Sequence, residues 1–207
     1  NPVARALAGG EVVTGATDLM LTNRDGGEHA VELTATPIRG AVGEILGAVL
    51  VFRDVTEVRA LGQRVISILP PAPFELVCSS VEAEFIKYAG NNWLYIKVVY
   101  INILYDFVQK LGGNYEAVRD AFAADPRMGR SHLDPIHQSG HGGPPGRGAG
   151  GHCFIKDYAA FRSMYERTFP EDKLGIEALK GLEQKNVKLL RDTHKDLDLL
   201  EGVYGKA

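Results

Sequence analysis

The sequence predicts an α+β protein: a three-stranded antiparallel sheet in the first quarter of the chain, then an all-helical domain with a long buried helix. Residues 18–55 alternate between apolar and polar side chains and are interrupted by turn residues, which is typical of half-buried strands. Residues 81–110 have apolar side chains in almost every direction, which is typical of a buried helix. We therefore expect two domains, at residues 1–63 and 64–207.

Three strands in a meander account for the first section. Leu19–Thr22 and Val31–Ala35 alternate, and Asp25–Gly27 between them predicts a hairpin. A second turn at Arg39–Glu44 leads into Ile45–Phe52, a β-branched run dense enough for a central strand.

A connector helix follows the strands. Apolar residues recur at spacings of three and four at Val58, Leu61, Val65 and Ile68, which favours a helix or a short coiled coil. The proline-rich segment 70–73 ends it, because proline lacks an amide donor and clashes with the preceding turn.

The long helix at 81–110 follows Ser79 or Ser80 as a candidate N-cap and stops at Gly112–Gly113. A membrane span needs about 20 nearly uninterrupted apolar residues, and four polar side chains interrupt this run. They are Asn91, Asn92, Lys97 and Asn102. We therefore expect no membrane span, and we favour burial of this helix in a domain core or a subunit interface.

Shorter helices complete the predicted second domain. Tyr115–Ala123 is the first, and an aromatic stripe at helical spacing after Cys153 predicts the next. An amphipathic helix at Leu174–Leu190 and a short tail at Leu197–Tyr204 follow. The intervening segment 125–152 is rich in Gly, Pro and His, and its length for a connector indicates a functional loop.

Composition narrows the functional classes. The formal net charge is -3 and no long run of Lys or Arg is present, which argues against non-specific nucleic-acid binding. The two cysteines, Cys78 and Cys153, lie far apart, and no secretory signal is evident. We expect free thiols in a reducing cytoplasm.

Cys153 is the strongest candidate for chemistry. It lies where the glycine-rich segment 146–151 becomes a helix, and backbone amides at a helix start favour a thiolate. Asp157 is one turn further on, and Lys87 and Asn91 share one face of the long helix because they are four residues apart. The alternative is a solvated Lys87, a core amide at Asn91 and a helix-dipole partner at Asp157.

Imidazole and thiolate groups suit zinc, which makes a metal site an alternative. The candidate ligands are His132, His137, His141, His152 and Cys153. Their spacings match no familiar zinc module, so we assign no metal and expect loop histidines.

Four segments of the first section resemble the C-terminal half of a PAS sensor domain. They are Arg24–Gly26, Ala35–Arg39, Gly43–Gly47 and Phe52–Glu57. The resemblance implies the last three strands of a PAS sheet and the start of its signalling helix.

Five later segments resemble, in order and spacing, the central region of UDP-glucose/GDP-mannose 6-dehydrogenases. They are Glu82–Asn91, Lys97, Ile101–Asn102, Asp125–Gly129 and Gly150–Asp157. The resemblance covers about residues 65–190 and implies a helical middle domain that forms a homodimer through the long helix and contributes to a nucleotide-sugar site. That family oxidises the primary alcohol of a nucleotide sugar to a carboxylate in two steps with NAD.

The resemblance also implies roles for single residues. Cys153 matches the nucleophile that attacks the intermediate aldehyde, giving a thiohemiacetal and then a thioester. Lys87 and Asn91 match the donors that hold the reacting oxygen. Asp157 matches the carboxylate that helps to activate water for thioester hydrolysis.

Substrate contacts are implied for three further residues. Gly150 and Gly151 match glycines whose backbone borders the sugar, and Arg127 resembles an arginine that reaches a neighbouring subunit's substrate. No G-x-G-x-x-G follows a strand in this sequence, so we expect no NAD-binding residues and no activity from the chain alone, as a fusion or a fragment. The alternative is a PAS-type sensory or dimerisation module with a non-catalytic helical partner domain.

Overall fold

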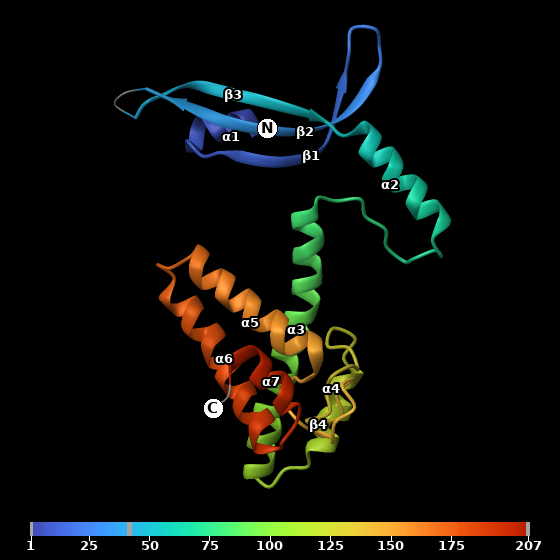
Figure 1. Cartoon of the computed structure of the whole chain (residues 1–207), viewed down its shortest axis with the longest axis vertical. Helices are drawn as coiled ribbons and strands as arrows, with labels where there is room; N and C mark the ends of the chain where they lie inside the picture. The colour runs from blue at the N-terminus through green and yellow to red at the C-terminus, as the bar shows by residue number, and fades with distance from the viewer. Residues whose placement is uncertain (1, 41–42, 206–207) are drawn as a thin grey trace. The chain divides into compact units, whose positions relative to one another are not determined.

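The computed structural model describes residues 2–40 and 43–205, which divide into two compact units. The first unit comprises residues 1–78 and the second residues 79–207. Figure 1 draws the first in blue to cyan and the second in green to red. The predicted domain boundary at residue 63 falls inside a helix of the first unit, so where the dehydrogenase-like domain begins stays a prediction.

The first unit contains a three-stranded antiparallel sheet in the order β1-β2-β3, which confirms the predicted meander. The strands are β1 (Val13–Thr22), β2 (Glu28–Arg39) and β3 (Ile45–Asp54). In the first turn the side chain of Asn23 accepts hydrogen bonds from the backbone of Asp25 and Gly27. Part of the second predicted turn, Ala41 and Val42, lies outside the described residues.

Helix α1 (Pro2–Gly9) packs on this sheet and was not predicted. Its sequence signal is a proline at the first helical position and glycines at the end. Ala6 of α1 is buried, as are Val31, Leu33 and Ala35 of β2, so the core of this unit lies between the helix and the central strand.

Helix α2 (Thr56–Ile68) confirms the predicted connector and ends before the prolines. Asp54 fixes its start, because one carboxylate oxygen accepts from the backbone of Thr56 at 2.9 Å and the other pairs with His29 at 2.9 Å. These interactions, first those with Thr56 and then that with His29, lower the pKa of Asp54 to about 2.

The second unit is built around α3 (Ser80–Lys110), the long helix expected from the sequence. Ser79 and Glu82 form a capping box at its start, as the predicted N-cap requires. At its end Gly112 adopts a positive φ of 73°, the conformation that glycine accommodates best.

The remaining elements follow the predicted order (Figure 1). They are α4 (Tyr115–Ala124), β4 (Ile136–His137), β5 (Gly146–Arg147), α5 (Gly151–Thr168), α6 (Lys173–Asp192) and α7 (Leu197–Tyr204). The antiparallel β4–β5 pair is the only addition to the expected helices within residues 79–205. Helix α5 begins two residues before Cys153, which places the thiol in its first turn.

The core of the second unit lies where α3 meets α5 and α6. Tyr95 and Tyr158 stack there with ring centroids 3.9 Å apart, beside buried Val98 and Val99. Most of the circumference of α3 between Asn92 and Asn102 is buried, and several large apolar side chains gather on the remaining, exposed side. They include Phe85, Ile86, Trp93, Tyr100, Ile103 and Phe107. Within the described residues, no helix has both the length and the apolar character that crossing a bilayer demands.

Candidate active site

The carboxylate of Asp157 is the centre of the candidate site. Its side chain is only 3% exposed, and two hydrogen-bond donors and one further ammonium group, from two helices, surround it. Asn91 Nδ2 donates to Oδ2 at 2.6 Å, Lys156 Nζ donates to Oδ1 at 2.6 Å, and Lys87 Nζ lies 3.6 Å from Oδ2. Helix packing therefore brings the predicted Lys87, Asn91 and Asp157 together.

Two opposing effects set the charge of Asp157. Burial is the largest and would raise the pKa of the carboxyl, but the hydrogen bonds from Lys156 and Asn91 and the charges of Lys156 and Lys87 oppose it. The net result is a pKa below the ordinary 3.8. Asp157 is thus an ionised, nearly buried acceptor at neutral pH.

Cys153 is exposed and precedes Asp157 by one turn of α5. It is the third residue of this helix, where unpaired backbone amides give the helix end partial positive charge. Lys156 is three residues further on, so its ammonium shares a helix face with the thiol. The hydrogen bond to Asp157 is the main cause that raises the pKa of Lys156, which stays a cation there.

Side chains from α6 and the α6–α7 loop fix the glycine-rich segment that precedes the thiol. Asn186 brackets Ala149, accepting from its N–H at 2.7 Å and donating to its carbonyl at 3.0 Å. Lys195, which is completely buried, donates to the carbonyls of Gly148 at 2.9 Å and Gly146 at 3.3 Å. These hydrogen bonds hold residues 146–149 in place immediately before the helix that carries Cys153.

Gly150 and Gly151 lie at the start of α5, as the sequence predicts. Gly150 is the N-cap residue, and Gly151 has a positive φ of 83° that favours glycine. The backbone N–H of Gly151 donates to Oδ2 of Asp196 at 2.8 Å. Contact of this backbone with a sugar stays a prediction.

Arg127 stands apart from this cluster. Its guanidinium pairs with Asp125 at the end of α4, and its side chain is 80% exposed. Among the described residues, nothing links it to Asp157 or Cys153. Lys97, which is nearly buried, donates to the carbonyls of Met128 and Gly129 at 2.9 and 3.1 Å and so holds the segment that presents Arg127.

Two of the histidines weighed as metal ligands lie together near Cys153. His141 Nδ1 is 3.0 Å from His152 Nε2, and His141 Nε2 is 2.8 Å from a carboxylate oxygen of Asp198. Within residues 2–40 and 43–205, no three His, Cys, Asp or Glu side chains are arranged to hold a metal ion.

Sequence reasoning missed three groups that shape this site: Lys156, Lys195 and Asp196. Lys156 adjoins Asp157 in the chain, and helical periodicity alone places such neighbours on different faces. Lys195 and Asp196 lie in a short loop before α7, and Asp196 has a left-handed φ of 51°. The sequence offered one signal, two adjacent charged residues between two predicted helices. Their contact with the glycine-rich segment 146–151 is made only in the folded chain, so the sequence did not reveal it.

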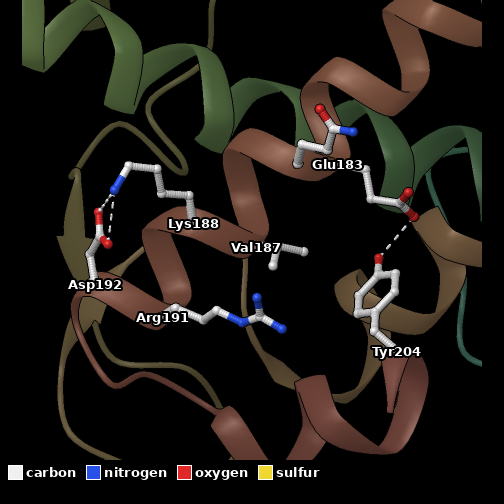
Figure 2. A pocket seen from close by; sticks show the side chains of 7 residues that line it. Glu183, Val187, Lys188, Arg191, Asp192 and Tyr204 are labelled. Carbon is white, nitrogen blue, oxygen red and sulfur yellow. Dashed lines mark hydrogen bonds and ion pairs between the residues drawn. The ribbon is translucent and has the colours of Figure 1, made fainter. Parts of the chain in front are cut away.

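A separate pocket of about 440 Å³ lies between α6 and α7 (Figure 2). Lys188 points toward Asp192, and the hydroxyl of Tyr204 donates to Glu183 at 2.9 Å. The pocket is lined by neither Cys153 nor Asp157, so it is distinct from the candidate active site.

Two families match parts of the chain. Residues 81–186 match the UDP-glucose/GDP-mannose dehydrogenase family, central domain, and residues 1–60 match the PAS fold. Both confirm the resemblances seen in the sequence. Among solved structures, a Vibrio cholera VqmA–ligand–DNA complex aligns with 61% of this chain and 53% of its own at 19% identity, but its TM-score of 0.23 supports no inference.

Known relatives match the second unit. A UDP-glucose 6-dehydrogenase of Rickettsia felis is 32% identical over 110 residues, 53% of this chain and 22% of its own length. UDP-glucose 6-dehydrogenase TuaD of Bacillus subtilis is 36% identical over 124 residues, 60% of this chain and 24% of its own. A UDP-glucose 6-dehydrogenase of Rhizobium meliloti is 40% identical over 78 residues, which are 38% of this chain and 16% of its own length. The chain therefore spans less than a quarter of the length of these relatives.

Proposed function

The chain belongs to the UDP-glucose/GDP-mannose dehydrogenase family, and we propose that its second unit is the part of such an enzyme that holds a nucleotide sugar and bonds covalently to its aldehyde form. The observation that supports this most directly is the convergence of Lys87, Asn91 and Lys156 on the buried carboxylate of Asp157, one helical turn from an exposed thiol. A buried carboxylate whose pKa is shifted by specific charged partners is a functional-site candidate, because such groups concentrate at functional sites.

The proposed step is addition of the Cys153 thiol to an aldehyde. The thiol loses its proton, sulfur forms a bond to the carbonyl carbon and the π electron pair moves to oxygen. That oxygen takes up one proton, which balances the one lost from sulfur, and the product is a thiohemiacetal. Lys87 and Asn91 have further N–H groups beyond those that face Asp157, so they can donate to the developing alkoxide. Asp157 stays ionised. The role that the family resemblance implies for it, activating water for thioester hydrolysis, would come only after an oxidation for which the described residues hold no oxidant.

NAD is the oxidant that the family uses, and the described residues do not fit it. Within residues 2–40 and 43–205 the only sheets are antiparallel, whereas a dinucleotide site of this kind requires a parallel sheet with a glycine-rich turn before a helix. We therefore derive no oxidation step for this chain, and we expect these 207 residues alone to produce no NADH from a nucleotide sugar.

Two further properties belong to the same proposal. The exposed apolar side chains along α3, Trp93 and Phe107 among them, support a homodimer through this helix. Both cysteines are free of disulfides, which supports a reducing, cytoplasmic location. The rival function is a PAS-type sensory or dimerisation module in which the helical unit only assembles.

Thiol labelling separates the two functions. The rate of alkylation by a small neutral probe is measured for Cys153 and Cys78 in the folded protein, each divided by its rate in denaturant. This ratio removes the advantage of simple exposure, because an exposed but unactivated thiol reacts no faster folded than unfolded. We expect a ratio above one for Cys153 and below one for half-buried Cys78.

Repeating the labelling in the presence of candidate ligands tests the substrate class. The 6-aldehyde of UDP-glucose should slow alkylation of Cys153 and leave Cys78 unchanged, whereas UDP alone should protect less. A Cys153 ratio of one or less, with no protection by the aldehyde, would favour the PAS-type module.

A further inference from the structure

Helix α5 begins without a capping side chain of its own. Its N-cap residue is Gly150, which has no side chain to accept from the unpaired amides of the first turn. Ser, Thr, Asp and Asn are preferred at this position because their side chains accept a hydrogen bond from those amides. The helix that presents Cys153 therefore needs a partner from elsewhere in the chain.

Asp196 is that partner. Its Oδ2 accepts from the N–H of Gly151 at 2.8 Å, its Oδ1 accepts from the hydroxyl of Ser139 at 2.9 Å, and it is only 5% exposed. Asp196 is also the N-cap residue of α7, yet its side chain makes no capping hydrogen bond to α7. Within the described part of the chain, the Asp196 carboxylate instead accepts a hydrogen bond from the first turn of α5.

The identity of residue 150 follows from this arrangement. A Cβ atom added to Gly150 would overlap the Asp196 carboxylate and lie 3.0 Å from Cε of Lys195. A conventional capping residue at position 150 and the Asp196 carboxylate therefore exclude each other. Buried Lys195 holds the preceding glycine segment by its hydrogen bond to Gly148.

A second connection joins the same two helices. Asp198, in the first turn of α7, bonds His141, and His141 bonds His152, the residue before Cys153. The start of α7 thus contacts the start of α5 both through Asp196 and through this histidine pair.

We propose that Asp196 is a positioning residue for Cys153, capping helix α5 from the α6–α7 loop in place of the side chain that Gly150 lacks. The consequence for Cys153 depends on the proposed function, since it treats this thiol as the nucleophile. The capping contact itself does not depend on it.

The test compares Asp196→Asn with Asp196→Ala. Both variants are neutral, so a difference between them does not report the loss of charge. It combines the lost cap with the strain of alanine in a left-handed backbone, and the double variant below separates these two contributions because it restores a cap without relieving the strain. Asn can still accept from Gly151 and tolerates the left-handed backbone, φ 51°, at this position. Hydrogen exchange of amides 151–154 and the alkylation rate of Cys153 are measured in each.

We expect faster exchange at 151–154 in Asp196→Ala than in Asp196→Asn, by about 2- to 30-fold, the range for loss of an N-cap hydrogen bond. Cys153 should be alkylated at least about twofold more slowly in Asp196→Ala, because its turn frays. A double variant, Asp196→Ala with Gly150→Ser, should recover both properties. Removing the carboxylate leaves Cε of Lys195, 3.0 Å from the new Cβ, as the remaining close contact, and a small shift of that side chain accommodates a conventional cap.

Equal exchange in the two single variants would overturn the proposal, and so would changed exchange with an unchanged Cys153 rate. If Asp196→Ala does not fold, a folded double variant with protected amides supports the cap, and a double variant that also fails overturns it. Should Cys153 prove unreactive in the wild type, the proposed function fails, and the exchange comparison alone decides whether Asp196 caps α5.

Discussion

Replacing Asn91 with alanine removes one of the two hydrogen-bond donors to Asp157. The lost hydrogen bond joins Asn91 Nδ2 to Asp157 Oδ2 at 2.6 Å, and the acceptor is an ionised side chain only 3% exposed. Hydrogen bonds to charged groups contribute about 1.5–3 kcal/mol. Lys156 and Lys87 remain beside the carboxylate, so the cost should stay below that of an orphaned buried charge, about 3–5 kcal/mol.

We therefore expect Asn91→Ala to lower the free energy of unfolding of the second unit by about 1.5–3 kcal/mol at pH 7. The melting temperature should fall by roughly 5 to 15 °C for a unit of this size. Circular dichroism at 222 nm follows this unit, because it contains most of the helices. Gln109→Ala, an exposed amide on the same helix, is the matched control and should change stability by less than about 0.5 kcal/mol.

The pH dependence gives the sharper test. The pKa of Asp157 lies below its ordinary 3.8, so its contribution is fully present above that value and is lost as the pH falls through the folded pKa. The penalty of Asn91→Ala should therefore shrink as the pH falls below 3.8. A penalty equally large at low pH would show that Asn91 acts by packing, and no penalty at pH 7 would refute the hydrogen bond to a buried charge.

Two other predictions concern the sheet junction and the long helix. Asp54, whose pKa is lowered to about 2 chiefly by Thr56 and then by His29, should stabilise the first unit above pH 3.8 and lose that effect toward pH 2. Asp54→Asn should reduce the loss of stability of the first unit between pH 3.8 and pH 2, measured by amide exchange in β2. An unchanged dependence of stability on pH in this variant would contradict the prediction. Trp93→Glu combined with Phe107→Glu should change the mass at sedimentation equilibrium from twice the chain mass of 22.5 kDa to a single chain. A wild type already at the single mass would exclude the dimer.

Regular elements could be predicted because their signals are local. The period of the apolar residues predicted α2 and α6, and the turn residues predicted the meander of β1 to β3. Helix α3 was predicted in position, but its exposure was not, since an apolar residue on a helix face does not reveal whether the same chain or another covers it. One face of α3 packs in the second unit, while Trp93 on another is 66% exposed.

The candidate site could be predicted only within each helix. Spacings of four showed that Lys87 and Asn91 share a face of α3, and that Cys153 and Asp157 share a face of α5. Which faces meet is decided by packing between segments distant in the chain, so the contact of Asn91 with Asp157 had no local signal. Lys156 was missed although its partner is the next residue in the sequence. Helical periodicity places adjacent residues on different faces, but the long lysine side chain still reaches the carboxylate of Asp157.

The glycine-rich segment before Cys153 has a second explanation that changes how its variants should be interpreted. Glycines there were predicted to let the backbone approach a ligand, yet a Cβ on Gly148 would lie 2.9 Å from Oδ1 of Asn186, and its φ is 90°. A Cβ on Gly150 would overlap Asp196. Substituting either glycine therefore disturbs the support of α5 whether or not a sugar binds. Loss of the aldehyde's protection of Cys153 in such a variant is evidence for a substrate contact only if amide exchange at the start of α5 is unchanged.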